Sequence, residues 1–324
     1  MEILYLSQAD IIALDIGMPD VIRIVEAALR EQGEGRVEMP PKPGIHPLPQ
    51  TFIHAMPAYL PRLGAAGMKW IACFPENTRR GLEQTTGVLV MNDPETGAPI
   101  AIMDAAWITA VRTAAITAIG AKHLARQDSR TLGIVGAGVQ GRYNLLALAE
   151  VLPELREVRI ADKRQEAVEG FIKEPRPHFP DIRVEPAASP ETAVRGSDVV
   201  VTATMFYLTR PLVKAEWFDP GCFAAPLEAD YAWEPAAVRL ADKLVTDDAE
   251  QTRYFAAHGC FPEGMPPLYS ELAEIVCGQK PGREKSDERI ISICLGMALE
   301  DVALGHYITD LAQSRWIGRR LPLA

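Results

Sequence analysis

The sequence is poor in cysteine and histidine, and neither residue forms a disulfide or metal-binding pattern. Its five cysteines are widely scattered with no Cys-x-x-Cys pair, and its six histidines show no His-Glu-x-x-His spacing. Scattered thiols in odd number are typical of a reducing compartment, because a disulfide framework needs paired cysteines. We therefore expect a cytoplasmic protein with no metal site.

Positive charge and long apolar runs are also lacking. The formal net charge is −10, which disfavours nucleic acid and anionic membranes as partners. No run of about 18 apolar residues occurs, and the N-terminal stretch has no basic segment before an apolar run. We expect neither a transmembrane helix nor a signal peptide, and a small molecule as the partner.

What is present is the composition of an ordinary globular protein. The 324 residues are 48% hydrophobic and 23% charged, which suggests two domains at roughly 150 residues each. Over the first hundred residues the pattern predicts a helix at 19–29, an irregular proline-rich segment at 39–49, and a small mixed sheet. Its expected strands are 51–56, 67–74, 87–92 and 99–103, with a turn at 93–97 before the last.

The sequence pattern changes after a long helix expected from Asp104 to Arg126. Short apolar strands then alternate with helical stretches, which is typical of a parallel sheet flanked by helices. These strands are 132–135, 158–161, 198–204, 222–227, 243–246 and 290–294. A final helix at about 295–313 is expected to return to the first domain, which would then be discontinuous.

A glycine motif follows the first of these strands. Gly136-Ala137-Gly138-Val139-Gln140-Gly141 matches G-x-G-x-x-G, with a strand running in and a helix running out. Gly136 permits the tight turn, Gly138 lets the backbone approach a pyrophosphate, and Gly141 allows close packing of helix and strand. The helix N-terminus then favours the anion, so the motif predicts a dinucleotide site on a Rossmann fold.

The next strand ends in an acid, which is the second half of that fingerprint. Asp162 follows at roughly the usual spacing of about 20 residues, and a carboxylate there binds ribose hydroxyls and repels a 2′-phosphate. NAD is therefore the expected cofactor, while Lys163 and Arg164 leave NADP as the alternative. Thr202-Ala203-Thr204 ends another strand and is a second expected cofactor contact, or else an ordinary strand end.

Three cations stand in largely apolar surroundings. Lys69 lies in an otherwise uncharged run, so it either extends to solvent or faces a ligand. Arg112 lies in a helix of small residues, where a guanidinium pairs with a carboxylate of substrate or protein. Lys42, in Pro40-Pro41-Lys42-Pro43, is either a solvated loop residue or a third contact.

Two carboxylates follow the strand at 222–227. Glu228 and Asp230 point the same way in an extended chain, so both either face the ligand crevice or belong to a solvated acidic loop. In a partly dry crevice such a pair titrates together with one raised pKa, which provides a proton donor near neutral pH.

Taken together, these stretches resemble the ornithine cyclodeaminase/μ-crystallin family along nearly the whole chain. The residues that carry the resemblance are Phe74-Pro75-Glu76-Asn77 with Arg80-Gly81-Leu82, Asn92-Asp93-Pro94-Glu95-Thr96-Gly97, Thr109-Ala110-Val111-Arg112-Thr113-Ala114-Ala115, the 132–140 strand and turn, Val200-Val201-Thr202-Ala203-Thr204, and Leu295-Gly296-Met297-Ala298-Leu299-Glu300-Asp301.

The resemblance implies an α/β protein in two parts and assigns roles to the candidate residues. It implies a Rossmann NAD(P)-binding domain at 117–296 and a discontinuous α+β dimerisation and substrate domain at 1–116 and 297–324, in a homodimer. Lys69 and Arg112 are similar to the family's substrate-carboxylate binders, Lys69 with a catalytic role and Arg112 also at the cofactor. Asp230 resembles the catalytic aspartate, and Glu228 and Lys42 join the expected substrate site.

The chain also departs from the family pattern. Lys42 stands where many members have an arginine, and Tyr231-Ala232-Trp233-Glu234 replaces the usual segment after the aspartate, which argues against an ornithine-specific pocket. We predict an NAD(P)-dependent amino-acid dehydrogenase or imine reductase. The alternatives are an ornithine cyclodeaminase, which recycles its NAD, and a non-catalytic NAD(P)H-dependent binder.

Overall fold

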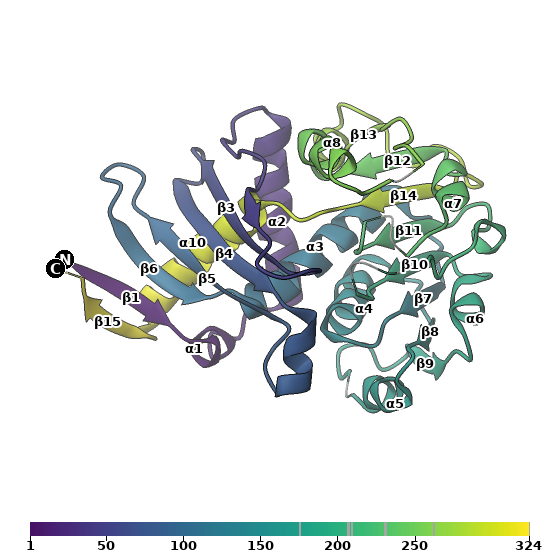
Figure 1. Cartoon of the computed structure of the whole chain (residues 1–324), viewed down its shortest axis with the longest axis horizontal. Helices are drawn as coiled ribbons and strands as arrows, with labels where there is room; N and C mark the ends of the chain where they lie inside the picture. The colour runs from purple at the N-terminus through teal and green to yellow at the C-terminus, as the bar shows by residue number, and fades with distance from the viewer. Residues whose placement is uncertain (175, 206–207, 209, 230–231, 262, 324) are drawn as a thin grey trace. The chain divides into compact units, whose positions relative to one another are not determined.

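The structure is a computed structural model that describes residues 1–174, 176–205, 208, 210–229, 232–261 and 263–323. The chain divides into two compact units (Figure 1). One joins Met1–Arg112 to the C-terminal stretch that begins at Gly296, and the other is Thr113–Leu295. The predicted α/β fold class is confirmed, and the domain limits after residues 116 and 296 stay a prediction.

The first unit is built on a mixed sheet of seven strands, in the order β15-β1-β6-β5-β4-β3-β2. The strands are β1 Glu2–Leu6, β2 Gly44–Ile45, β3 Phe52–Leu60, β4 Ala65–Cys73, β5 Thr85–Asn92, β6 Pro99–Asp104 and β15 Arg319–Pro322. Only β1 and β6 pair in parallel among the described strands of this sheet. The β5–β6 turn forms as predicted, with Asp93 accepting hydrogen bonds from the amides of Glu95 and Thr96.

The C-terminal helix α10 (Ala298–Arg315) packs on this sheet. It contacts β3, β4, β5 and the helix α2 (Met18–Gly33), and Figure 1 shows it lying across the strands. Most of the first half of α10 is buried, including two consecutive acids, Glu300 and Asp301. This helix therefore belongs to the first unit. Two shorter helices, α1 Gln8–Ile12 and η1 Pro75–Arg80, complete the unit.

The proline-rich segment differs from its prediction. It was expected to be wholly irregular, but Gly44 and Ile45 form the edge strand β2 against His54 and Ile53. The prediction is wrong here because an edge strand needs few backbone hydrogen bonds and tolerates flanking prolines. Glycine is required at 44, since an added Cβ would lie 2.2 Å from the ring of His54.

The second unit holds a sheet of eight strands in which every pair is parallel, in the order β13-β12-β14-β11-β10-β7-β8-β9. The strands are β7 Thr131–Val135, β8 Glu157–Ala161, β9 Arg183–Pro186, β10 Val199–Thr202, β11 Phe223–Pro226, β12 Lys243–Thr246, β13 Ser270–Glu271 and β14 Ile290–Ile293. Strand order reverses between β7 and β10. In an open parallel sheet, this switch point at the carboxyl ends is where a ligand binds.

Helices connect these strands. They are α4 Val139–Val151, α5 Gln165–Lys173, α6 Pro190–Val194, η2 Ala215–Trp217, α7 Pro235–Arg239, α8 Ala249–Ala257 and α9 Leu272–Val276, and the long helix α3 Ala106–Leu124 leads into the unit. Among the helices of the described residues, none has the length and hydrophobicity that crossing a bilayer requires.

Candidate functional site

The glycine fingerprint forms a tight turn between β7 and α4. Gly136 has φ +119°, and its amide donates to the carbonyl of Ala161 at 2.7 Å. A Cβ on Gly136 would lie 2.3 Å from the carbonyl oxygen of Ala203, and one on Gly141 would lie 2.1 Å from the carbonyl oxygen of Gly136. Both positions therefore accept only glycine, as the fingerprint requires.

Gly138 is different, because its surroundings are open. It is the N-cap of α4, and an added Cβ would meet no described heavy atom within 4 Å. Val139 begins the helix with 59% of its surface exposed, and Gln140 follows it. The N-terminus of a helix favours an anion, and Gly138 has no side chain that would block access to it. These residues therefore fit a pyrophosphate.

Asp162 lies directly beside this turn, at the end of β8. Its Oδ2 accepts a hydrogen bond from the amide of Ala137 at 2.9 Å, and its Oδ1 accepts one from the amide of Arg164 at 2.9 Å. The carboxylate is thereby fixed next to the fingerprint, where an adenosine ribose would present its hydroxyls. Lys163 and Arg164 are exposed, which keeps the NADP alternative open.

The segment Thr202–Thr204 lies at the end of β10, on the other side of the switch point. Glu228 is 1% exposed and accepts hydrogen bonds from the hydroxyls of Thr202 at 2.7 Å and Thr204 at 2.6 Å, and also from the amide of Thr204. Burial raises the pKa of Glu228, while these hydrogen bonds oppose the rise. Three of the predicted residues thus form one cluster. Asp230 lies outside the described residues.

Lys69 is buried in the first unit. It is 0% exposed on β4, and its Nζ lies 2.7 Å from the carboxylate of Asp301 and 3.4 Å from the hydroxyl of Thr109. Burial lowers the pKa of Lys69 to about 8, with Arg112 adding to the effect and Asp301 opposing it. The ammonium therefore carries its charge at neutral pH, in a dry environment that strengthens its attraction to an anion.

Arg112 belongs to the same cluster. Its Nη1 donates to Glu300 at 2.8 Å, and its Nε lies 3.3 Å from Asp301. Gly296 has φ +82°, and a Cβ there would lie 2.4 Å from Nη1 of Arg112. Glycine at 296 therefore makes room for the guanidinium.

Lys42 and His54 lie near this cluster. Lys42 is also buried, and its Nζ donates to the carbonyl of Gly296 at 3.2 Å. His54 on β3 stacks on Phe52 with ring centroids 4.1 Å apart. Burial, together with Lys42, His46 and Lys69, lowers the pKa of His54 to about 3, so this imidazole is neutral. The structure thus brings Lys42, Lys69 and Arg112 into one unit, with the buried face of β4 and α10 around them.

The partners of these cations were not predicted from the sequence. Glu300 and Asp301 are fully buried on α10 and hold Arg112 and Lys69 in place. Two consecutive acids in the otherwise apolar Leu295–Leu304 stretch are the signal that would have found them, since buried carboxylates are almost always paired.

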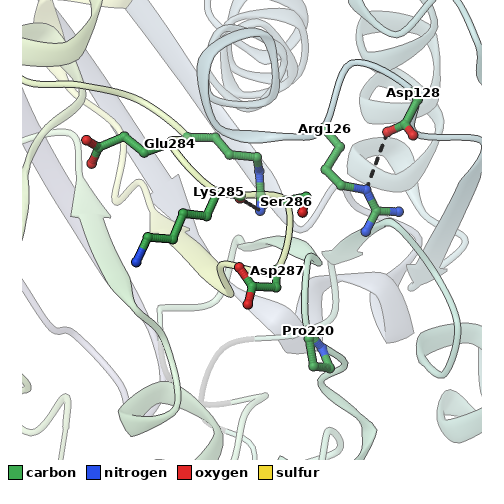
Figure 2. A pocket seen from close by; sticks show the side chains of 8 residues that line it. Arg126, Asp128, Pro220, Glu284, Lys285, Ser286 and Asp287 are labelled. Atoms are coloured by element: carbon green, nitrogen blue, oxygen red, sulfur yellow. Dashed lines mark hydrogen bonds and ion pairs between the residues drawn. The ribbon is translucent and has the colours of Figure 1, made fainter.

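A separate cavity of about 560 Å³ lies at the opposite edge of the parallel sheet, before strands β7, β11 and β14 (Figure 2). Figure 2 shows Arg126 turned toward Asp128, with 3.4 Å between Nε and Oδ1. Basic and acidic side chains line it in equal number, three of each, so it favours neither an anion nor a cation. Its residues are Arg126, Asp128, Pro220, Arg283, Glu284, Lys285, Ser286 and Asp287.

The fold and the fingerprint together define a protein class, a Rossmann-type dinucleotide-binding protein whose first unit carries a buried cation cluster. The chain belongs to the ornithine cyclodeaminase/mu-crystallin family, whose model matches residues 3–315. The predicted family is confirmed.

Similar proteins extend over nearly the whole chain. The nodulation efficiency protein NfeD of Rhizobium meliloti is 36% identical over 97% of each chain. The structure of the Thermococcus litoralis Δ1-pyrroline-2-carboxylate reductase in complex with NADH and L-proline has a TM-score of 0.87 at 31% identity, covering 98% of this chain and 99% of that one. An archaeal alanine dehydrogenase dimer with bound NAD has a TM-score of 0.87 at 32% identity and complete coverage of both chains.

Proposed function

We propose that this protein is an NAD-dependent oxidoreductase that transfers a hydride at the α-carbon of an amino or imino acid. The observation that carries the proposal is Lys69, a fully buried ammonium held by Asp301 beside Arg112. Two buried cations on neighbouring elements form a site for a carboxylate, and the second unit carries a dinucleotide fingerprint. Relatives solved with NADH and proline, and with NAD, support the same chemistry.

The residues of the proposed substrate site have different roles. Lys69 and Arg112 bind the α-carboxylate of the substrate, with Lys42 as a further cation near them. Asp301 and Glu300 do not bind substrate; they orient the two cations and reduce the cost of burying them. Asp230, by its resemblance to the family's catalytic aspartate, holds the proton that the substrate nitrogen loses or gains.

The dinucleotide is held by the second unit. Gly136, Gly138 and the N-terminus of α4 bind its pyrophosphate, and Asp162 binds the adenosine ribose. When bound, NAD accepts the hydride that leaves the α-carbon, and NADH returns it in the reductive direction. Orientation supplies most of the rate, since hydride transfer needs the two carbons within about 3–3.5 Å.

The protein acts as a homodimer in this proposal. Several outward-facing side chains of the seven-stranded sheet are apolar, with Trp70 41% exposed and Val88 40% exposed directly opposite each other on β4 and β5. A cavity of about 660 Å³ opens on the same face, beside Tyr59 and Met68. Exposed apolar surface of this kind marks an interaction site, and the archaeal alanine dehydrogenase forms a dimer.

The experiment is to follow nicotinamide absorbance and ammonia release in parallel. Purified protein is given NAD with a panel of amino acids, and NADH with 2-oxo acids plus amines and with cyclic imines. We expect net oxidation or reduction of the cofactor with one substrate class. Ammonia from ornithine with no net change in cofactor would instead identify a cyclodeaminase. No reaction at all, with NADH still bound, would favour a non-catalytic binder.

A further inference from the structure

Glu228 is a buried acid whose neighbours all donate hydrogen bonds to it. The indole Nε1 of Trp233 donates to the Thr202 hydroxyl at 3.1 Å, which leaves the hydrogen of that hydroxyl available for its hydrogen bond to Glu228. The Thr204 amide can only donate, so Oε1 of Glu228 acts as an acceptor, while Oε2 receives the Thr202 hydroxyl. Hydrogen bonds donated by two hydroxyls and a backbone amide stabilise the ionised form of this carboxylate.

No cation is paired with this carboxylate among the residues that the structure describes. Its hydrogen bonds come from two threonine side chains and one backbone amide. Buried charges in proteins are normally paired, because removing a charge from water is costly. Next along the chain, Ala229 has φ +57°, a conformation that costs about 1 kcal/mol or more for a residue with a Cβ.

The carboxylate is coupled to the dinucleotide turn through Ala203. Glu228 fixes Thr202 and Thr204 on both sides of Ala203. The amide of Ala203 donates to the carbonyl of Val135 at 2.8 Å, and its own carbonyl approaches Gly136 so closely that no Cβ fits there. Glu228 therefore holds in place the Ala203 backbone, which packs against the glycine turn at Gly136.

The position of Glu228 relative to the switch point decides which end of the cofactor it meets. Asp162 lies at the end of β8, on the side of β7 that receives the adenosine half of a dinucleotide. Glu228 follows β11, beyond β10 on the other side, which receives the nicotinamide half. The nicotinamide ring is cationic in NAD⁺ and neutral in NADH.

We propose that Glu228 is a positioning residue whose unpaired buried negative charge makes the site prefer the oxidised, cationic nicotinamide over the reduced one. It acts through Thr202 and Thr204, which it holds, and through its electrostatic field, without touching the substrate. This inference rests on the proposed function, since it takes the dinucleotide to be NAD.

The test compares the affinities of NAD⁺ and NADH for Glu228→Gln and the wild type, with no substrate present. NADH binding is measured by its fluorescence and NAD⁺ binding by calorimetry. We expect the ratio Kd(NAD⁺)/Kd(NADH) to rise roughly tenfold in Glu228→Gln, which corresponds to about 1.4 kcal/mol. Thr202→Val is the matched control: it removes one hydrogen bond but keeps the charge, so both affinities should fall together.

Equal weakening of both cofactors in Glu228→Gln would overturn the proposal and leave Glu228 a purely structural role. If Glu228→Gln does not fold, Glu228→Ala removes the charge without introducing a new hydrogen-bond donor. An unchanged ratio in Glu228→Ala would also overturn the proposal. Neither result depends on turnover. Failure of the proposed function would instead be seen as the absence of hydride transfer with every substrate of the panel.

Discussion

At the scale of single residues, the buried lysine sets the expected pH dependence. Burial lowers the pKa of Lys69 to about 8, so its ammonium is present below that pH and is lost as the pH rises through it. The inhibition constant of a simple carboxylate such as propionate should therefore rise by about tenfold per pH unit above pH 8. Propionate does not titrate in this pH range, so a change in its inhibition constant reflects the titration of a group on the protein.

Lys69→Arg supplies the matched control. A guanidinium stays protonated throughout this pH range, so the alkaline loss of propionate inhibition should disappear in the variant. A wild-type inhibition constant that stays flat from pH 7 to 9.5 would contradict the assignment of Lys69 as a carboxylate-binding residue.

Asp230 provides a second prediction at this scale. Asp230→Asn keeps the size of the side chain but can no longer exchange a proton, so turnover should be abolished while NADH binding is retained. Turnover is followed by nicotinamide absorbance, and binding by fluorescence titration. Asp128→Asn, at an exposed carboxylate, should keep full turnover. Substantial activity in Asp230→Asn would exclude the catalytic role.

At the scale of secondary-structure elements, two glycines of one turn should respond differently to alanine. Gly136→Ala places a Cβ 2.3 Å from the Ala203 carbonyl oxygen at φ +119°, so it should destabilise the fold by more than about 2 kcal/mol. Gly138→Ala meets no described atom, so it should keep the melting temperature and weaken NADH binding by at least about tenfold, because its Cβ enters the pyrophosphate space.

Thermal unfolding and NADH titration of both variants test this pair. Gly138→Ala with wild-type NADH affinity would show that the pyrophosphate does not approach α4 at this glycine. A Gly136→Ala protein as stable as the wild type would show that the Ala203 segment shifts at little cost to accommodate the added Cβ.

The elements also show which parts of the structure a sequence can reveal. The strand–glycine–helix unit at 132–151 is predictable because its signals lie next to one another in the chain. The edge strand β15 was missed because all four of its residues are exposed and show no alternation. The partners of Lys69 and Arg112 were missed for another reason. They lie 232 and 188 residues away, and no local pattern encodes such a pairing.

At the scale of the whole molecule, the proposed homodimer gives a prediction about association. Trp70→Glu places a charge on the apolar outer face of the seven-stranded sheet, so it should shift the protein from dimer to monomer. Size-exclusion chromatography with light scattering measures the change. Leu240→Glu, at an exposed leucine of the second unit, is the control and should remain dimeric. A Trp70→Glu protein that is still fully dimeric would place the interface elsewhere.

The return of α10 to the first unit has a consequence for biosynthesis. A ribosome releases the chain N-terminus first, at about 5–20 residues per second, so the parallel sheet of 113–295 is complete before α10 is made. Until then Lys69 and Arg112 lack the carboxylates of Asp301 and Glu300, and burying them is unfavourable. The nascent protein therefore acquires its dinucleotide fold first, and the proposed carboxylate site of Lys69 and Arg112 forms only after the last helix is made.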